Sequence, residues 1–158
     1  EEEDNFIVLA DTTMITQALT NLLKNAAESI EAAAKDMEKK PLEGMIAIKL
    51  FKIGPDLEIS IYDTGLGLNS KENKYFEPYV TTKKTGTGLG LAITRKIIEQ
   101  HDGSLELFDS ETIIDSKIVK GAAARISIPL ISNQDMAFED GDSLAYDDKE
   151  KINKIEKV

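Results

Sequence analysis

The sequence predicts an α+β fold of two layers, in which helices cover one face of a mixed β-sheet. Residues 14–40 place apolar side chains at three- and four-residue steps, which is the pattern of a half-buried helix. Residues 45–62 alternate apolar and polar side chains around a Gly-Pro-Asp turn, which is the pattern of a β-hairpin. A stretch with three alternating glycines, residues 86–90, stands directly before a second helical segment.

The first helix follows a short apolar run, Phe6–Leu9, that we expect to be extended. Asp11 and Thr12 are residues that commonly cap a helix. The buried face of the helix is predicted from its apolar side chains, and the helix should end before Pro41. These side chains are Ile15, Ala18, Leu19, Leu22, Leu23, Ala26, Ala27 and Ile30.

Polar side chains border this apolar face. Asn21, Asn25 and Glu28 stand at i, i+4 and i+7, so they form one stripe along the helix. A polar shoulder on a surface helix explains the stripe equally well from the residues alone. Asparagine is nevertheless a mediocre helix former, so two asparagines in mid-helix favour a specific role.

The hairpin should direct one set of apolar side chains toward the helix. That set comprises Ile46, Ile48, Leu50, Leu57, Ile59 and Ile61. The second strand runs into Asp63 and a glycine turn with Gly65 and Gly67. An Asp that simply forms the turn is the alternative explanation for this motif.

The glycine-rich stretch has two explanations. Residues 86–90 could bring backbone N–H groups and a helix N-terminus close to phosphate, or they could act as a hinge. A dinucleotide fold is disfavoured, because its fingerprint is G-x-G-x-x-G after a strand. The preceding residues 69–85 are polar and irregular around an aromatic patch at 75–79, and so long a segment is usually functional or disordered.

The rest of the chain predicts a helix over residues 89–101 and two strands over 104–108 and 122–130. The connection over residues 109–120 is long for a hairpin. From these elements we expect one domain over residues 1–131. An acidic C-terminal tail over residues 132–158 should be mobile or loosely docked.

Composition limits the classes of function. The 158 residues carry a net charge of −10, which disfavours nucleic acid and anionic membranes as partners. The absence of cysteine excludes disulfides and thiolate metal sites. No apolar run approaches the roughly 20 residues that a membrane-spanning helix needs.

The motifs are most informative in their order. From about Asp11 to Leu130 the chain resembles the ATP-binding catalytic domain of sensor histidine kinases, within the superfamily shared with gyrase B, heat-shock-90 chaperones and MutL repair proteins. Residues 22–28, 76–83 and 86–91 look most like the nitrogen-regulation, NtrY-like branch. The resemblance implies a Bergerat-type ATP-binding fold with a flexible ATP lid over about residues 69–87. It also implies that the first strand lies upstream of Phe6, so that the chain is truncated.

The resemblance also implies roles for individual residues. Asp63 should accept a hydrogen bond from the adenine amino group, with Gly65 and Gly67 turning close to the base. Asn25 should ligate Mg²⁺ through its amide oxygen, and Asn21 should support the phosphate and metal side. The aromatic residues Tyr75, Phe76 and Tyr79 should anchor the lid or contact a partner domain. The polyphosphate should be met by Thr82, Lys83, Gly86, Thr87, Gly88, Leu89 and Gly90.

Several positions depart from the family pattern or lack a role. Thr64 stands where Asn is common, which puts one minor polar contact in doubt. Glu28 stands where some relatives have Lys, so no binding role is assigned to it. His101 is the only histidine, and we interpret it as a helix-end or core-edge residue.

One position separates kinases from hydrolases in this superfamily. The hydrolases place a Glu one helical turn before the metal-binding Asn, where it activates water. Asn21 occupies that position and cannot take a proton. We therefore expect an ATP-dependent protein-histidine kinase domain with no catalytic residue of its own, since the phosphoacceptor histidine belongs to a separate dimerisation domain.

The expected cofactors are ATP and Mg²⁺, and the expected partners are that dimerisation domain and a response regulator. The expected location is the cytoplasm, as part of a larger kinase with or without a membrane anchor. Two alternatives stay open: an anti-sigma-factor-like serine kinase, and a nucleotide-binding scaffold without catalysis.

Overall fold

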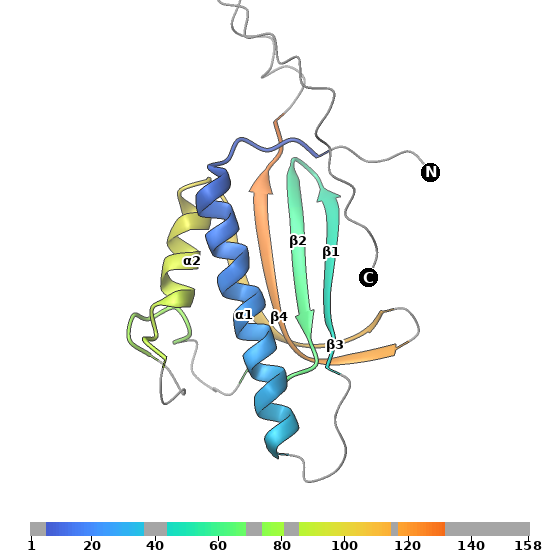
Figure 1. The fold of residues 1–158 in the computed structure, drawn as a ribbon. Helices are drawn as coiled ribbons and strands as arrows, with labels where there is room; N and C mark the ends of the chain where they lie inside the picture. Colours follow the sequence, from blue (N-terminus) through green and yellow to red (C-terminus); the bar gives the residue numbers. More distant parts are fainter. Residues whose placement is uncertain (1–5, 37–43, 69–73, 81–85, 115–116, 132–158) are drawn as a thin grey trace, which may run out of the picture.

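The computed structural model describes residues 6–36, 44–68, 74–80, 86–114 and 117–131. These residues form two layers, with both helices on one face of a four-stranded sheet (Figure 1). The predicted α+β architecture is confirmed. The elements in chain order are α1 (Thr12–Asp36), β1 (Ile46–Ile53), β2 (Asp56–Asp63), α2 (Gly90–Glu99), β3 (Ser104–Ile114) and β4 (Lys117–Pro129).

The sheet has the strand order β1-β2-β4-β3, and its three strand pairs are all antiparallel. The pairs Ile48–Ile61 and Leu50–Ile59 place the expected apolar side chains of the hairpin on one face, because directly opposed residues of antiparallel strands share a side. On β2, Ile61 is buried beneath the helices. On β1, Ile48 and Leu50 stay about half exposed, because β1 is an edge strand.

The core lies between the helices and the central strands. Helix α1 begins at Thr12 because the Asp11 carboxylate accepts a hydrogen bond from the Met14 N–H at 3.0 Å, which confirms the predicted cap. The predicted stretch of helix over residues 37–40 lies outside the described residues. The buried cluster comprises Ala18, Leu22, Ile61, Ile97, Ile98, Leu105, Ala124, Ile126 and Ile128.

The connection between the last two strands differs from the prediction. Strand β3 continues to Ile114 and β4 begins at Lys117, so most of residues 109–120 belong to the paired strands rather than to a long connection. The pairing runs from Ser104–Ser127 to Ile114–Lys117. Its far end projects beyond the other strands (Figure 1). Cross-strand pairing therefore outweighed a sequence that contains no glycine turn.

The N-terminal segment is extended, as predicted. It is held by the residues that follow β4 and by His101, just after α2. Val8 bridges Leu130, and the Ile131 N–H donates to the Ile7 carbonyl at 2.8 Å. His101 Nε2 accepts a hydrogen bond from the Asp11 N–H at 3.0 Å, and its Nδ1 lies 2.7 Å from the Ile97 carbonyl. The helix-end interpretation of His101 is confirmed, since the imidazole ties α2 to the start of α1.

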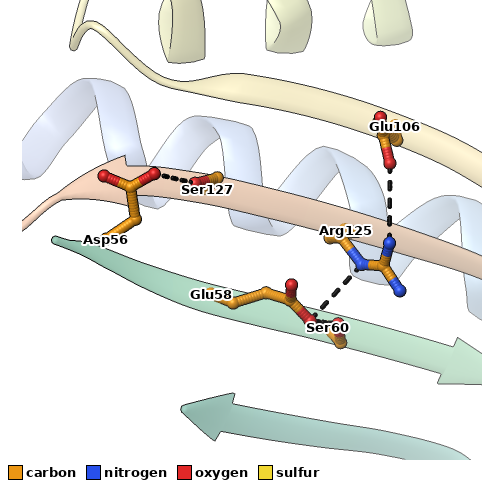
Figure 2. A network of polar contacts seen from close by, with 6 residues as sticks. All are labelled: Asp56, Glu58, Ser60, Glu106, Arg125 and Ser127. Carbon is orange, nitrogen blue, oxygen red and sulfur yellow. Dashed lines mark hydrogen bonds and ion pairs between the residues drawn. The ribbon is translucent and has the colours of Figure 1, made fainter. Parts of the chain in front are cut away.

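The sheet face opposite the helices carries a network of polar contacts over β2, β4 and β3. Figure 2 shows the Arg125 guanidinium of β4 between Glu58 of β2 and Glu106 of β3, with N–O distances of 3.3 and 3.6 Å. Ser60 donates to the same Glu58 carboxylate at 3.0 Å. The Arg125 guanidinium also lies 4.8 Å from the Phe108 ring centroid. The asparagines of α1, the Asp63 turn and the glycine-rich stretch lie on or beside the other, helix-bearing side.

Candidate nucleotide site

The site begins at a buried carboxylate where β2 ends. Asp63 is only 6% exposed, and its Oδ1 accepts hydrogen bonds from the Gly65 N–H at 2.8 Å and the Ala122 N–H at 3.4 Å. Burial raises the pKa of Asp63, although these two backbone hydrogen bonds oppose the rise. Within the described residues, both side-chain hydrogen bonds of Asp63 use Oδ1, so Oδ2 remains available as an anionic acceptor.

The turn after Asp63 packs against Ser29 of helix α1. The Leu66 N–H donates to Ser29 Oγ at 3.1 Å, and a Cβ added to Gly65 would lie 2.7 Å from the Ser29 carbonyl carbon. Gly67 has φ +77°, a conformation that side chains disfavour. Both glycines are thus required by the protein's own turn. That turn holds the Asp63 carboxylate beside α1.

Asn21 and Asn25 of the predicted polar stripe, together with Ser29, lie along α1 between this turn and the glycine-rich stretch. Asn21 Nδ2 donates to Thr94 Oγ1 at 3.4 Å, and the buried Thr94 hydroxyl donates to the Gly90 carbonyl at 2.9 Å. Asn21, Asn25 and Ser29 follow one another at i, i+4 and i+8, about 6 Å apart along the helix axis. Asn25 therefore lies between the Asp63 turn and the start of α2, on the face that borders both.

The glycine-rich stretch divides into two functional parts. Gly88 has φ +68°, and a Cβ there would lie 2.6 Å from the Tyr79 carbonyl carbon. The Tyr79 N–H donates to the Gly88 carbonyl at 3.1 Å, so this glycine holds the aromatic segment. By contrast, a Cβ added to Gly90 would meet nothing within 4 Å. Gly90 therefore leaves open space at the beginning of α2.

Phe76 anchors the aromatic segment to the core. Phe76 packs against the core cluster and lies 5.1 Å below the Arg95 guanidinium of α2. Tyr79 is 78% exposed and does not contribute to the core. Leu89 precedes α2 and provides no side-chain cap, so the first N–H groups of the helix are not satisfied by such a cap.

We predict opposite consequences for Gly90→Ala and Gly88→Ala. Gly90→Ala should leave stability unchanged or raise it by up to about 1 kcal/mol, since Ala is the better helix former and meets no neighbour. It should weaken ATP binding, because a methyl group would occupy the open space. Gly88→Ala should lower stability by about 1–3 kcal/mol through backbone strain and overlap with Tyr79.

Thermal unfolding and calorimetric titration with an ATP analogue measure the two effects separately. Equal loss of stability in both variants would contradict the division of the glycine-rich stretch. ATP affinity unchanged in Gly90→Ala would contradict a phosphate position beside that residue.

Sequence reasoning missed four residues that build the site. A Cβ on Gly121 would lie 2.9 Å from both the Asp63 carboxylate and the Gly65 N–H, and Asp109 Oδ1 accepts from the Leu68 N–H at 2.6 Å. Ser29 and Thr94 are the other two, through the hydrogen bonds given above. Gly121 would have carried a signal had β4 been predicted from Lys117, because an isolated glycine inside a strand often marks a close backbone approach.

The remaining predicted site residues are placed as follows. Gly86 and Thr87 are exposed and precede the turn at Gly88. Thr82 and Lys83 lie outside the described residues, as do most of the predicted lid residues. Thr64, whose role was in doubt, accepts a hydrogen bond from the Met45 N–H at 2.8 Å and so fastens the start of β1 to the end of β2. In the described part of the chain, no helix is long and apolar enough to cross a membrane.

Known proteins are similar to this chain in sequence. Residues 10–132 match the family described as histidine kinase-, DNA gyrase B-, and HSP90-like ATPase. The nitrogen regulation protein NtrY of Azorhizobium caulinodans is 50% identical over 101 residues, which cover 63% of this chain and 13% of that protein. Sporulation kinase B of Bacillus subtilis is 33% identical over 130 residues, which cover 82% of this chain and 27% of that protein.

A solved structure agrees with these sequence matches. The catalytic domain of histidine kinase ThkA is 33% identical with a TM-score of 0.57, covering 77% of this chain and 70% of the other. The chain spans only about an eighth to a quarter of the length of NtrY and sporulation kinase B. The predicted family and its NtrY-like branch are confirmed. The chain belongs to the histidine kinase-, DNA gyrase B- and HSP90-like ATPase family, and within it to the catalytic domains of sensor histidine kinases.

Proposed function

We propose that this domain binds Mg-ATP and donates the γ-phosphate to a histidine on a separate dimerisation domain, for relay to a response regulator. One observation carries the proposal. Three polar residues of α1 follow one another along one face, with Ser29 bonded to the Asp63 turn, Asn21 joined through Thr94 to the start of α2, and Asn25 between them. Adenine at Asp63 and phosphates at Gly90 would then lie on either side of Asn25.

Adenine selection is assigned to Asp63. Its Oδ1 is held by two backbone N–H groups, so the orientation of the carboxylate is fixed before a ligand arrives. An amino group is a donor that suits Oδ2, whereas the carbonyl of guanine at the equivalent position would face a negative charge. A charge-assisted hydrogen bond of this kind contributes about 1.5–3 kcal/mol.

Kinase chemistry is favoured over hydrolysis by Asn21. Its amide nitrogen donates to Thr94, so the side chain has a structural task between the two helices. An amide does not act as a general base toward water. The attacking group should therefore come from another domain, and phosphoryl transfer would depend mainly on positioning.

The residues present fit Mg²⁺ with a sparse ligand set. In the described segments, no group of three or more His, Cys, Asp or Glu side chains could hold a metal ion. The amide oxygen of Asn25 is a hard donor of the kind that Mg²⁺ accepts together with phosphate oxygens and water. We assign Asn25 as that ligand. Bound Mg²⁺ would supply neutralisation of phosphate charge.

The polyphosphate is assigned to the residues around the lid and the start of α2. Gly90 gives open space there, and the uncapped N-terminus of α2 offers backbone N–H groups. The other residues proposed for phosphate contact are Thr82, Lys83, Gly86, Thr87, Gly88 and Leu89.

As part of a larger kinase the domain would act in the cytoplasm, where both ATP and response regulators are present.

Calorimetric titration with non-hydrolysable ATP and GTP analogues, with and without Mg²⁺, tests the proposal. We expect binding of the ATP analogue, tighter binding with Mg²⁺, and at least tenfold weaker binding of the GTP analogue. With ATP itself the isolated domain should release little phosphate. Absence of binding, or equal affinity for both nucleotides, would overturn the assignment.

A further inference from the structure

The outer edge of β1 is an unused sheet edge. Within the described residues β1 pairs only with β2, so alternate backbone N–H and C=O groups of its eight residues face outward. Its apolar side chains are exposed on both faces: Ile46, Ile48 and Leu50 on the helix side, and Phe51 and Ile53 on the other. Their exposed fractions run from 36% to 54%. A long apolar edge of this kind is a template for another strand.

The charge of this edge favours an acidic strand. Lys49 and Lys52 are the only charged residues of β1, and they stand on opposite faces because they are three residues apart. Two copies of β1 placed side by side would gather four lysines, which opposes self-pairing. An acidic segment would instead neutralise both charges.

The chain carries such a segment just beyond the described residues. Residues 135–148 contain six acidic residues and no Lys or Arg, with apolar residues between them. Adjacent acidic pairs, Glu139-Asp140 and Asp147-Asp148, would direct one carboxylate to each face of a strand. This matches the opposite faces of the two β1 lysines.

The acidic segment follows β4 at the end of the sheet where the β1–β2 hairpin turns, which is the end from which it could run along β1. Strand β4 ends beside the hairpin that joins β1 and β2, and the Leu130 N–H donates to the Pro55 carbonyl at 2.9 Å (Figure 1). Moving from β4 past β2 and β1 takes about three strand spacings, or roughly 14 Å. The four extended residue steps from Ile131 to Asp135 cover about 14 Å. The chain can therefore turn over the hairpin tip and run back along β1 in the antiparallel sense.

We propose that the acidic segment, residues 135–148, pairs with the outer edge of β1 and extends the sheet by one strand. The contact would cover the exposed apolar side chains of β1 and bring carboxylates to Lys49 and Lys52. It is independent of nucleotide binding, since β1 carries none of the residues assigned to ATP.

Hydrogen exchange of the full chain tests this contact at the peptide that contains residues 46–53. The test variant reverses two charges, Glu139→Lys with Asp140→Lys, and the matched control reverses Glu150→Lys and Glu156→Lys outside the segment. We expect the outward amides of β1 to exchange at least tenfold faster in the test variant than in the unaltered chain or the control. Adding Lys49→Glu and Lys52→Glu to the test variant should restore slow exchange.

A second variant that ends at Asn133 should show the same fast exchange while its circular dichroism shows a folded domain. Equal exchange in the full and shortened chains would overturn the proposal. Protection of β1 that depends on protein concentration would also overturn it, because a second copy would then be the partner. ATP-analogue affinity, measured on the same variants, reports separately on the nucleotide site.

Discussion

Asp63→Asn is expected to weaken binding of an ATP analogue by about 10- to 150-fold while the domain stays folded. The substitution removes the negative charge of the acceptor, and a charge-assisted hydrogen bond is worth about 1.5–3 kcal/mol. Oδ1 of an asparagine can still accept from the Gly65 N–H. The amide NH₂ would then face the amino group of adenine, so two donors would oppose each other.

The same substitution should not lower the stability of the nucleotide-free domain at neutral pH. Burial raises the pKa of Asp63 in the folded state above its usual value of 3.8, so the folded protein holds this proton more tightly than the unfolded chain does. The associated stability is fully present below the unfolded pKa and is lost as the pH rises through the raised folded pKa. As the pH rises from the unfolded pKa through the raised folded pKa, the stability of Asp63→Asn relative to the unaltered domain should therefore increase.

Chemical unfolding from pH 4 to 7 and calorimetric titration at pH 7 measure these two effects. The control is Asp102→Asn, which removes the same charge from an exposed residue whose φ of 55° asparagine tolerates. ATP affinity should be unchanged in the control. Unaltered affinity in Asp63→Asn would mean that the carboxylate does not contact the nucleotide. A stability advantage for the variant that shrinks as the pH rises would contradict the effect of burial.

The sequence predicted those elements of the fold that have a clear local pattern, such as the spacing of apolar residues or a turn motif. The spacing of apolar residues gave α1, and the Gly-Pro-Asp turn gave the β1–β2 hairpin with its correct facing. The β3–β4 extension was missed because its polar and charged residues resemble a loop. Six pairs from Asp109–Ala122 to Ile114–Lys117 hold it in a ladder that local composition does not reveal.

The site divides in the same way. Asn21 and Asn25 were singled out because asparagine is a mediocre helix former in mid-helix, and Asp63 because it stands at a strand end before a glycine turn. Ser29 and Thr94 were not, because both resemble ordinary helical residues until the helices pack and the hydrogen bonds to Leu66 and Gly90 appear. Gly88 and Gly65 were identified as close-approach residues, but the structure shows that Tyr79 and Ser29 are what they approach. Sequence thus finds a glycine that must be small, whereas the neighbour that requires it is a property of the tertiary structure.

Gly121→Ala is expected to lower both stability and ATP affinity, although Gly121 lies on β4 and is not itself assigned to the nucleotide. A Cβ at this position would overlap the Asp63 carbonyl oxygen and lie 2.9 Å from Asp63 Oδ1 and the Gly65 N–H. These atoms belong to backbone or to a carboxylate held by backbone, so they cannot move aside as a flexible side chain does. Overpacking of this kind costs about 1–3 kcal/mol. The displaced Asp63 turn should weaken ATP-analogue binding at least tenfold.

Gly54→Ala provides the matched control for Gly121→Ala. Gly54 has φ +60° and no neighbour within 4 Å of an added Cβ, so alanine there strains the hairpin turn by about 1–2 kcal/mol without contacting anything. It stands at the opposite end of β2 from Asp63. Thermal unfolding should therefore show a loss of stability in both variants, whereas calorimetric titration should show a loss of affinity only in Gly121→Ala. If affinity fell equally in both, the loss would reflect general destabilisation, and Gly121 would have no specific part in positioning Asp63.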